Sequence, residues 1–376
     1  MDLSRETIRK IFVIFLRLLY TLFMSTKNQS YYNEQKIKLT KRLRGILMDF
    51  PDFALDFFTG IEGRTSALTR INYAYDLRTF FTWALNETNL FRDYKSIFEF
   101  QIQDLEKFHT THFERYMSYL TSYMDDAGNT VTNGERGKAR KIAAVRSFFK
   151  YFFRREMISV DVASKIEMPK LHDKPIIRLE KDEIYKFLDT VETGMGLSGH
   201  EKGFHKHTRI RDTAIMTLLL GTGLRVSECV GLNVDDVDFK SNGLNITRKG
   251  GNQVILYFSD EVKVALFDWI EVRSMNKYVE DEPALFVSLQ NRRISTRAVE
   301  KLVKKYAGIV TPLKHITPHK LRSTYGTRLY QETGDIYVVA DVLGHRDVNT
   351  TKKHYAAISD DIRKKASKAV GLRTGD

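Results

Sequence analysis

A short polar segment that contains two prolines, Pro169 and Pro175, divides this chain of 376 residues into two parts. Such a segment favours a semi-stiff linker, and a chain of this length is expected to form two domains. We therefore predict a helical extension over residues 1–65, a helical domain over 66–167, a linker over 168–177 and a second domain over 178–376.

Apolar residues recur at helical spacing on the N-terminal side of the linker. One arc of a helix that begins near residue 66 carries Ile71, Ala74, Leu77, Phe81 and Leu85. A second helix is predicted over about residues 105–124, with glycines in the loop that follows it. A third helix starts near residue 136 and runs towards residue 156. Residues 66–165 are thus expected to form a small all-helical bundle.

The C-terminal part mixes helical patterns with strand signals. The pairs Asn242-Gly243 and Gly250-Gly251 predict two hairpin turns between short strands. We interpret residues 193–207, rich in glycine and histidine, as a flexible basic loop. Their histidines lack a cysteine or carboxylate partner at ligand spacing, so no metal site is expected there. The predicted fold class is mainly α, with a small antiparallel β-sheet in the second domain.

The chain is strongly basic, with a net charge of +13 and a sequence pI of about 9.5. This excess favours a polyanionic partner such as nucleic acid, although charge alone is also compatible with a merely basic protein. The predicted third helix has eight basic residues between positions 136 and 155 and no acidic one. We expect DNA contacts from its basic residues Arg136, Lys138, Arg140, Lys141, Arg146, Lys150 and Arg154.

Cysteine usage and the N-terminal residues bear on the compartment. The only cysteine, Cys229, cannot form a disulfide within one chain, which fits a reducing, cytoplasmic location. Residues 11–23 form an apolar run that is too short for a membrane anchor, contains Arg17 and lacks a cleavage site for a signal peptide. An upstream start codon or a loose amphipathic helix is the preferred interpretation of residues 1–23.

Five residues of the C-terminal part suit one chemistry especially well, the attack of a phenol on a nucleic-acid phosphodiester. They are Arg225, His319, Arg322, His345 and Tyr355. Arginine forks bind the non-bridging oxygens of a phosphate, imidazoles donate or accept protons, and a tyrosine can act as a covalent nucleophile. Taken singly, each has an ordinary structural explanation, such as an ion pair between Arg225 and Glu228. Their joint order and local sequences make coincidence a poor explanation.

Residues 66–370 resemble tyrosine recombinases of the Xer/integrase kind. The resemblance is carried by residues 221–228 (Gly-Thr-Gly-Leu-Arg-Val-Ser-Glu), by 317–322 (Thr-Pro-His-Lys-Leu-Arg), by 343–345 (Leu-Gly-His) and by Tyr355. It implies a helical core-binding domain and a catalytic domain that together form a C-shaped clamp. The family's hairpin lysine maps to Lys249, and the neighbouring Arg248 leaves that assignment ambiguous.

The resemblance also implies a mechanism. Arg225, Arg322 and His345 hold the scissile phosphate, Tyr355 attacks it to form a 3′-phosphotyrosyl link, and Lys249 and His319 act as acid and base. No cofactor is expected, because one ester replaces another of similar energy. The implied partners are double-stranded DNA with a specific recombination site and three further copies of the chain, in a homotetramer; the sequence does not indicate an accessory protein.

Alternative functions remain open at this point. A type IB topoisomerase or a telomere resolvase would use the same chemistry, and a DNA-binding regulator that has lost catalysis would belong to a different class. The intact set of catalytic positions argues against the regulator. Among recombinases, the sequence does not separate a chromosome-dimer resolvase from a mobile-element integrase.

Overall fold

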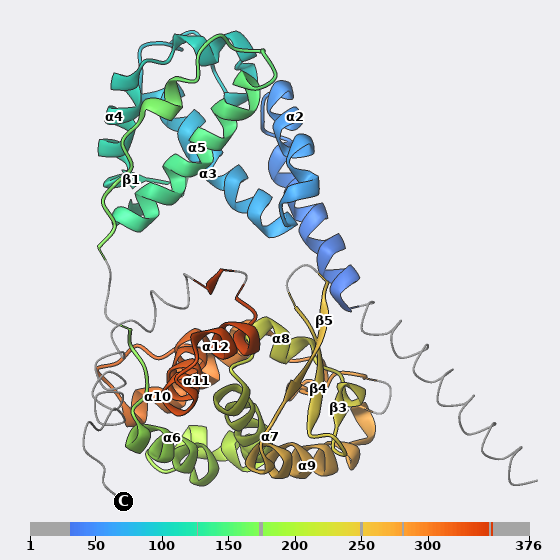
Figure 1. The fold of residues 1–376 in the computed structure, drawn as a ribbon. Coiled ribbons are helices and arrows are strands. Elements are labelled where there is room, and N and C mark those ends of the chain that lie inside the picture. Colours follow the sequence, from blue (N-terminus) through green and yellow to red (C-terminus); the bar gives the residue numbers. More distant parts are fainter. Residues whose placement is uncertain are drawn as a thin grey trace, which may run out of the picture. The chain divides into compact units, whose positions relative to one another are not determined.

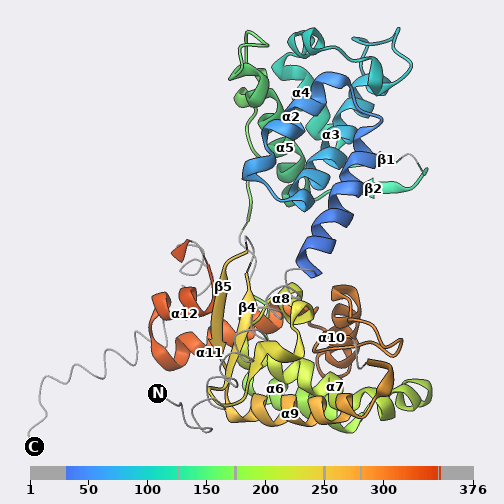
Figure 2. The same ribbon diagram turned by 90° about the vertical axis from the view of Figure 1, so that its right-hand side faces the viewer.

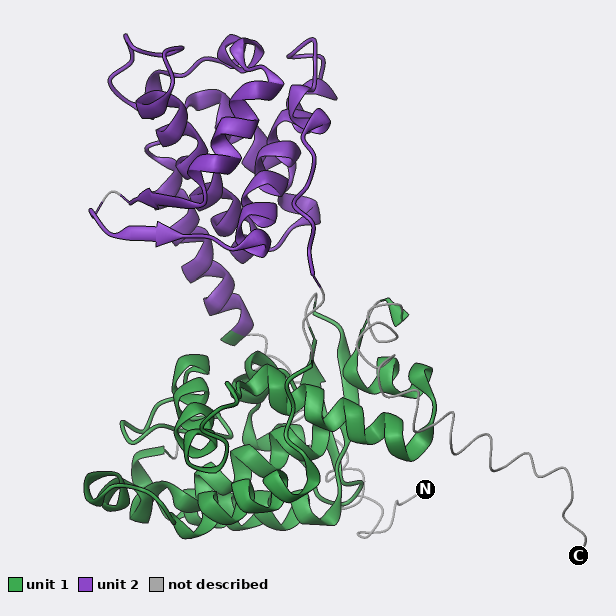
Figure 3. Cartoon of the chain, turned by 90° about the vertical axis from the view of Figure 1, so that its left-hand side faces the viewer, with its two compact units in different colours: residues 1–31, 175–376 green, residues 32–174 purple. Residues whose placement is uncertain are grey.

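The computed structural model describes residues 31–125, 127–172, 176–248, 251–279, 282–345 and 347–348. The chain divides into two compact units (Figure 3). We call residues 32–174 the helical unit and the described residues from 176 onward the mixed unit. Predicted positions Lys249 and Tyr355, and the segment after Tyr355, lie outside the described residues.

The helical unit is built from helices and short 3₁₀ turns around an aromatic core (Figure 1). Residues 31–47 are helical. The following elements are α2 (Asp52–Gly60), η1 (Glu62–Arg64), α3 (Ala67–Glu87), η2 (Ile97–Glu99), η3 (Ile102–Lys107), α4 (Thr110–Tyr119), β1 (Ser122–Met124), β2 (Thr130–Thr132), α5 (Glu135–Phe153) and η4 (Val162–Lys165). Phe57, Phe80, Phe113 and Phe149 are fully buried and join α2, α3, α4 and α5. Residues 31–65 therefore pack into the same core as residues 66–167.

The predicted helix over residues 105–124 is wrong in extent. The segment divides into η3, α4 and strand β1, which pairs antiparallel with β2 at Tyr123 and Val131. The reversal is built by Asp125, whose carboxylate accepts hydrogen bonds from the backbone N–H groups of Ala127 and Asn129. Such side-chain bonds compete with a helix and favour a turn.

The mixed unit surrounds a second core. Its elements are α6 (Lys181–Thr193), α7 (Gly199–Thr222), α8 (Val226–Gly231), η5 (Val234–Asp236), β3 (Val237–Asp238), β4 (Gly243–Thr247), β5 (Gln253–Tyr257), α9 (Asp260–Ser274), η6 (Lys277–Val279), α10 (Thr296–Val310), α11 (Pro318–Thr333) and α12 (Ile336–Leu343). The long helix α7 contacts α6, α9 and α11. Its buried face includes Ile215, Leu218 and Leu219.

The strands form an antiparallel sheet in the order β3-β4-β5, and Figure 2 shows β4 and β5 paired side by side. Asn242 adopts the left-handed conformation (φ 51°) at the turn between β3 and β4. Leu244 and Leu256 face each other across β4 and β5 and point into the core. The predicted hairpins and the fold class, mainly α with a small antiparallel sheet, are therefore confirmed.

The loop predicted over residues 193–207 is wrong from residue 199 onward, because α7 begins there. Ser198 caps the helix, and its backbone N–H donates in turn to Glu201. His205 is buried, and its Nε2 lies 2.7 Å from the carbonyl oxygen of Val191. His205 therefore packs α7 against α6.

Two properties of the described residues concern membranes and metal ions. None of their helices combines the length and the apolar composition that a bilayer crossing requires. Within the same residues, no three or more histidine, cysteine or acidic side chains gather in a group suited to a metal ion.

Candidate active site

The first predicted motif forms the turn between α7 and α8. Gly223 ends α7 in the left-handed conformation (φ 65°), and a Cβ at this position would collide with Tyr325. Arg225 is the N-cap of α8: its backbone N–H donates to Glu228 Oε2 (2.8 Å), and its Nη1 donates to Glu228 Oε1 (2.7 Å). The ion pair considered as the ordinary explanation of Arg225 therefore exists. Because Arg225 is still 34% exposed, the pair leaves room for a ligand.

The second motif lies at the start of α11, with Pro318 in the first turn. Arg322 is buried within the unit. Its Nη1 donates to the carbonyl oxygen of Gly223 (2.7 Å), and its Nη2 donates to that of Leu343. Arg322 thus connects the turn before Arg225 with the end of α12.

The third motif ends α12. Gly344 closes this helix in the left-handed conformation (φ 61°), and the backbone N–H of His345 donates to the carbonyl oxygen of Ala340 (2.9 Å). Arg225 Nη2 donates to the carbonyl oxygen of Gly344 (3.2 Å). The turns at 223–225 and 343–345 and the helix α11 are therefore joined by guanidinium groups, although the first motif lies about a hundred residues before the other two in the sequence.

Arg248, which follows β4, is also at this place. Its Nη1 donates to the carbonyl oxygen of Asp341 (3.1 Å) and its Nη2 to that of Val342 (2.8 Å). From the sequence, Arg248 is expected only as an alternative to Lys249 in acid catalysis. No pattern in the sequence predicts this contact, because Arg248 lies 93 residues before Asp341 and 94 residues before Val342.

The assembled groups can bind a phosphate. A guanidinium carries five N–H donors in a planar fork, so an arginine that donates to protein carbonyls retains others. Tyr325, packed near Gly223, is a poor nucleophile, because burial raises the pKa of its phenol and keeps it protonated.

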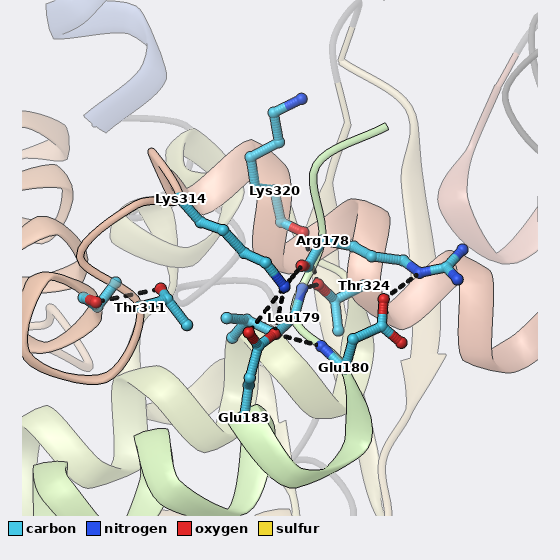
Figure 4. Close-up of polar contacts among 9 residues, drawn as sticks. Arg178, Leu179, Glu180, Glu183, Thr311, Lys314, Lys320 and Thr324 are labelled. Atoms are coloured by element: carbon cyan, nitrogen blue, oxygen red, sulfur yellow. Dashed lines mark hydrogen bonds and ion pairs between the residues drawn. The ribbon is translucent and has the colours of Figure 1, made fainter. Parts of the chain in front are cut away.

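The chain that enters the mixed unit is anchored to α11 (Figure 4). The backbone N–H of Leu179 donates to Thr324 Oγ1 (3.0 Å), and Lys314 Nζ pairs with Glu183 (2.6 Å). Burial alone would raise the pKa of Glu183, but the hydrogen bonds from Lys314 and from the backbone of Glu180 outweigh it and lower that pKa. Thr324 lies two residues from Arg322, so this anchor holds the helix that carries the second motif.

The predicted DNA-contacting residues of α5 fall into two groups. Arg136, Lys150 and Arg154 are exposed. Lys141 is only 7% exposed, and its Nζ contacts the buried carboxylate of Asp76 on α3 (3.2 Å).

Three other α5 cations are also engaged within the unit. Arg140 pairs with Asp76, Lys138 Nζ lies 3.5 Å from Glu135, and Arg146 donates to the carbonyl oxygen of Ser164 (3.3 Å). Asp76, at a position far away in the sequence, compensates the charges of Arg140 and Lys141, and Glu135 at the start of α5 compensates that of Lys138.

Comparison with known proteins places these motifs in a family. The sequence pattern of the Phage integrase family matches residues 177–361. The tyrosine recombinase XerC of Caldanaerobacter subterraneus subsp. tengcongensis is 31% identical over 328 residues, which cover 84% of each chain. The tyrosine recombinase XerC of Psychromonas ingrahamii is 33% identical over 242 residues, covering 62% of this chain and 76% of the relative.

Solved structures share the fold at lower identity. The XerH site-specific recombinase bound to palindromic difH substrate superposes with a TM-score of 0.61 at 18% identity, covering 80% of each chain. A λ integrase dimer bound to a COC′ core site gives a TM-score of 0.56 at 15% identity, covering 80% of this chain and 93% of the integrase. The chain therefore belongs to the tyrosine recombinases, a family of site-specific DNA recombinases, and is one of its Xer-like members.

Proposed function

We propose that this recombinase cuts and rejoins DNA through a covalent 3′-phosphotyrosyl intermediate on Tyr355, and that it acts as a tetramer on two duplexes. One observation carries the proposal: Arg225 and Arg322, from separate motifs, both donate to the turn that bears His345. Two guanidiniums and an imidazole brought to one turn suit a single phosphodiester.

In the proposed reaction, His319 accepts the proton of the Tyr355 phenol as the phenolic oxygen attacks phosphorus. The bond from phosphorus to the 5′ oxygen breaks, and Lys249 gives that oxygen a proton. Arg225 and Arg322 offset the charge that develops on the non-bridging oxygens, and His345 adds a hydrogen bond. A 5′-hydroxyl from the second duplex then attacks the phosphotyrosyl ester, which releases the phenol and seals the exchanged strand.

DNA binding by the helical unit is the second part of the proposal. The exposed residues Arg136, Lys150 and Arg154 on α5 can each neutralise a phosphate. Because the substrate is DNA, we also propose the cytoplasmic location that the sequence predicts. The exchange serves either chromosome-dimer resolution or the integration and excision of a mobile element, and the DNA site that is recombined will distinguish them.

The test is single-turnover cleavage of nicked suicide DNA that carries candidate sites, followed by denaturing electrophoresis. The wild-type chain is expected to form a covalent adduct, and Tyr355→Phe is expected to form none while binding the DNA normally. Tyr337→Phe is the matched control, since Tyr337 is 69% exposed on α12 and precedes His345. An adduct that persists in Tyr355→Phe would refute the assignment of the nucleophile.

Two further outcomes address the alternative functions. A topoisomerase would relax any supercoiled plasmid regardless of sequence, whereas a recombinase requires its site. A regulator without catalysis would bind the site and leave every strand intact. The tetramer is tested by sedimentation of the chain on paired sites, where four protein copies per two duplexes are expected.

A further inference from the structure

Arg248 closes the turn between β4 and β5 and reaches across the mixed unit. Its backbone N–H donates to the carbonyl oxygen of Asn252 (2.8 Å), and its own carbonyl accepts from the N–H of Gly251 (3.0 Å). The backbone of Arg248 is therefore part of the hairpin, while its guanidinium donates to Asp341 and Val342 at the end of α12. One residue links the hairpin to the helix that precedes His345.

The end of α12 gathers three guanidinium groups. The last carbonyls of a helix have no partner within it and carry partial negative charge. Here the carbonyls of four successive residues each accept from a guanidinium. Asp341 and Val342 accept from Arg248, Leu343 from Arg322, and Gly344 from Arg225. Arg248 thus belongs to the same cluster as the two arginines proposed to hold the phosphate.

Gly344 makes this contact possible. A Cβ built on Gly344 would collide with the guanidinium of Arg248, and the positive φ of 61° strains any L side chain at this position. Gly344, the glycine of the Leu-Gly-His motif, therefore both ends α12 and leaves space for Arg248.

We propose that Arg248 is a positioning residue, which holds the β4–β5 hairpin against the end of α12 and so fixes the turn that carries His345 and anchors Arg225 and Arg322. The inference rests on the proposed function of this site. It also favours Lys249 over Arg248 as the acid that protonates the leaving 5′ oxygen, because a guanidinium does not give up its proton in proteins, whereas a lysine ammonium can.

The experiment distinguishes positioning from acid catalysis by changing the leaving group. In DNA with sulfur at the 5′-bridging position, the phosphorus–sulfur bond breaks and the sulfur leaves as a thiolate, which needs no proton. Arg248→Ala is expected to slow cleavage about 10²-fold on ordinary DNA, the cost of a misplaced site, and by a similar factor on the sulfur substrate. Recovery on the sulfur substrate would make Arg248 the acid and overturn the inference, as would an unchanged rate on ordinary DNA.

Hydrogen exchange of the full chain supplies a readout that does not depend on activity. In Arg248→Ala, the backbone amides of Gly344 and His345 are expected to exchange about tenfold faster, because the carbonyls before them lose their donors. Unchanged exchange would overturn the inference. If the wild-type chain cleaves neither substrate, the proposed function fails, and the exchange result still decides whether Arg248 holds the turn.

Two further variants guard against a general folding defect. Arg248→Lys keeps the charge, but one ammonium does not reproduce a planar fork across two carbonyls, so it is expected to recover only part of the lost rate. Gly344→Ala is expected to slow cleavage by a larger factor in the wild-type background than in the Arg248→Ala background, where no guanidinium is left to displace. Full recovery by lysine, or equal costs of Gly344→Ala in both backgrounds, would contradict the positioning role.

Discussion

Arg225 is held by protein partners on two sides. Its backbone N–H and Nη1 are held by Glu228, and its Nη2 reaches Gly344. Glu228 is almost fully buried and fixes the guanidinium before any DNA arrives. Such preorganisation is what makes a charge effective in a transition state.

Replacing Arg225 should separate catalysis from binding. In Arg225→Ala, single-turnover cleavage is expected to fall about 10²–10³-fold, as for the loss of one preorganised donor. Affinity for the intact site, measured by fluorescence anisotropy, should change much less, because many phosphate contacts contribute to it. A parallel loss of affinity and cleavage would instead assign Arg225 to DNA binding or to folding.

Cys229 is fully buried, and its thiol offers a test of stability against pH. Burial and then the charge of Glu228 raise the pKa of its thiol to about 12. The neutral thiol therefore stabilises the fold fully below the ordinary thiol pKa, and this contribution is lost as the pH rises towards 12. Urea midpoints of the wild-type chain should decline more steeply above about pH 9 than those of Cys229→Ala. Identical declines, or rapid labelling of the folded protein by a thiol reagent at pH 8, would contradict a buried thiol.

At the scale of elements, the sequence predicts those helices and turns that depend on local patterns. The helices α3 and α5 and the hairpins around β4 follow from apolar spacing and from asparagine and glycine turns. The glycines of residues 199–207 predict a loop, but these residues are helical. Packing of His205 against Val191 extends α7 through them. The burial of Lys141 and the reach of Arg248 depend on partners far away in the sequence, which no local pattern contains.

The two kinds of cation on α5 provide a matched pair of lysines. Lys150→Gln should weaken DNA binding and make the negative slope of log K against log salt shallower by about 1, since an exposed phosphate contact is lost. Lys141→Gln should leave that slope unchanged and lower the free energy of unfolding by about 1–3 kcal/mol, because buried Asp76 loses a donor. A reduced salt slope in Lys141→Gln would show that Lys141 contacts DNA after all.

The anchor on α11 can be tested with two substitutions at one position. Thr324→Val keeps the shape but removes the acceptor of the Leu179 N–H, which should destabilise the fold by about 1–3 kcal/mol. Thr324→Ser keeps the hydroxyl and should cost less. Calorimetric melting of both variants makes the comparison, and a larger loss in Thr324→Ser than in Thr324→Val would mean that packing of the methyl group, rather than the hydrogen bond, is what Thr324 contributes.

At the scale of the whole molecule, the division into two units was predictable from the proline-containing linker and the chain length. Where the helical unit starts was not: Phe50 and Phe57 lie in the segment predicted as an extension, yet they are buried in the core of the helical unit. The segment before residue 66 has the pattern of a separate helix, and only the partners of Phe50 on α3 and of Phe57 on α5 show that it belongs to this core. The net charge of +13 belongs to the whole chain and is typical of a protein that acts on DNA.

The central claim is that the guanidinium cluster of the mixed unit serves a tyrosine nucleophile on DNA. Its most direct test is to trap the covalent adduct on suicide DNA, digest the protein and identify the modified peptide by mass spectrometry. We predict that the DNA is attached through its 3′ end to the peptide that contains Tyr355. Attachment through the 5′ end, or to a peptide without Tyr355, would contradict the account.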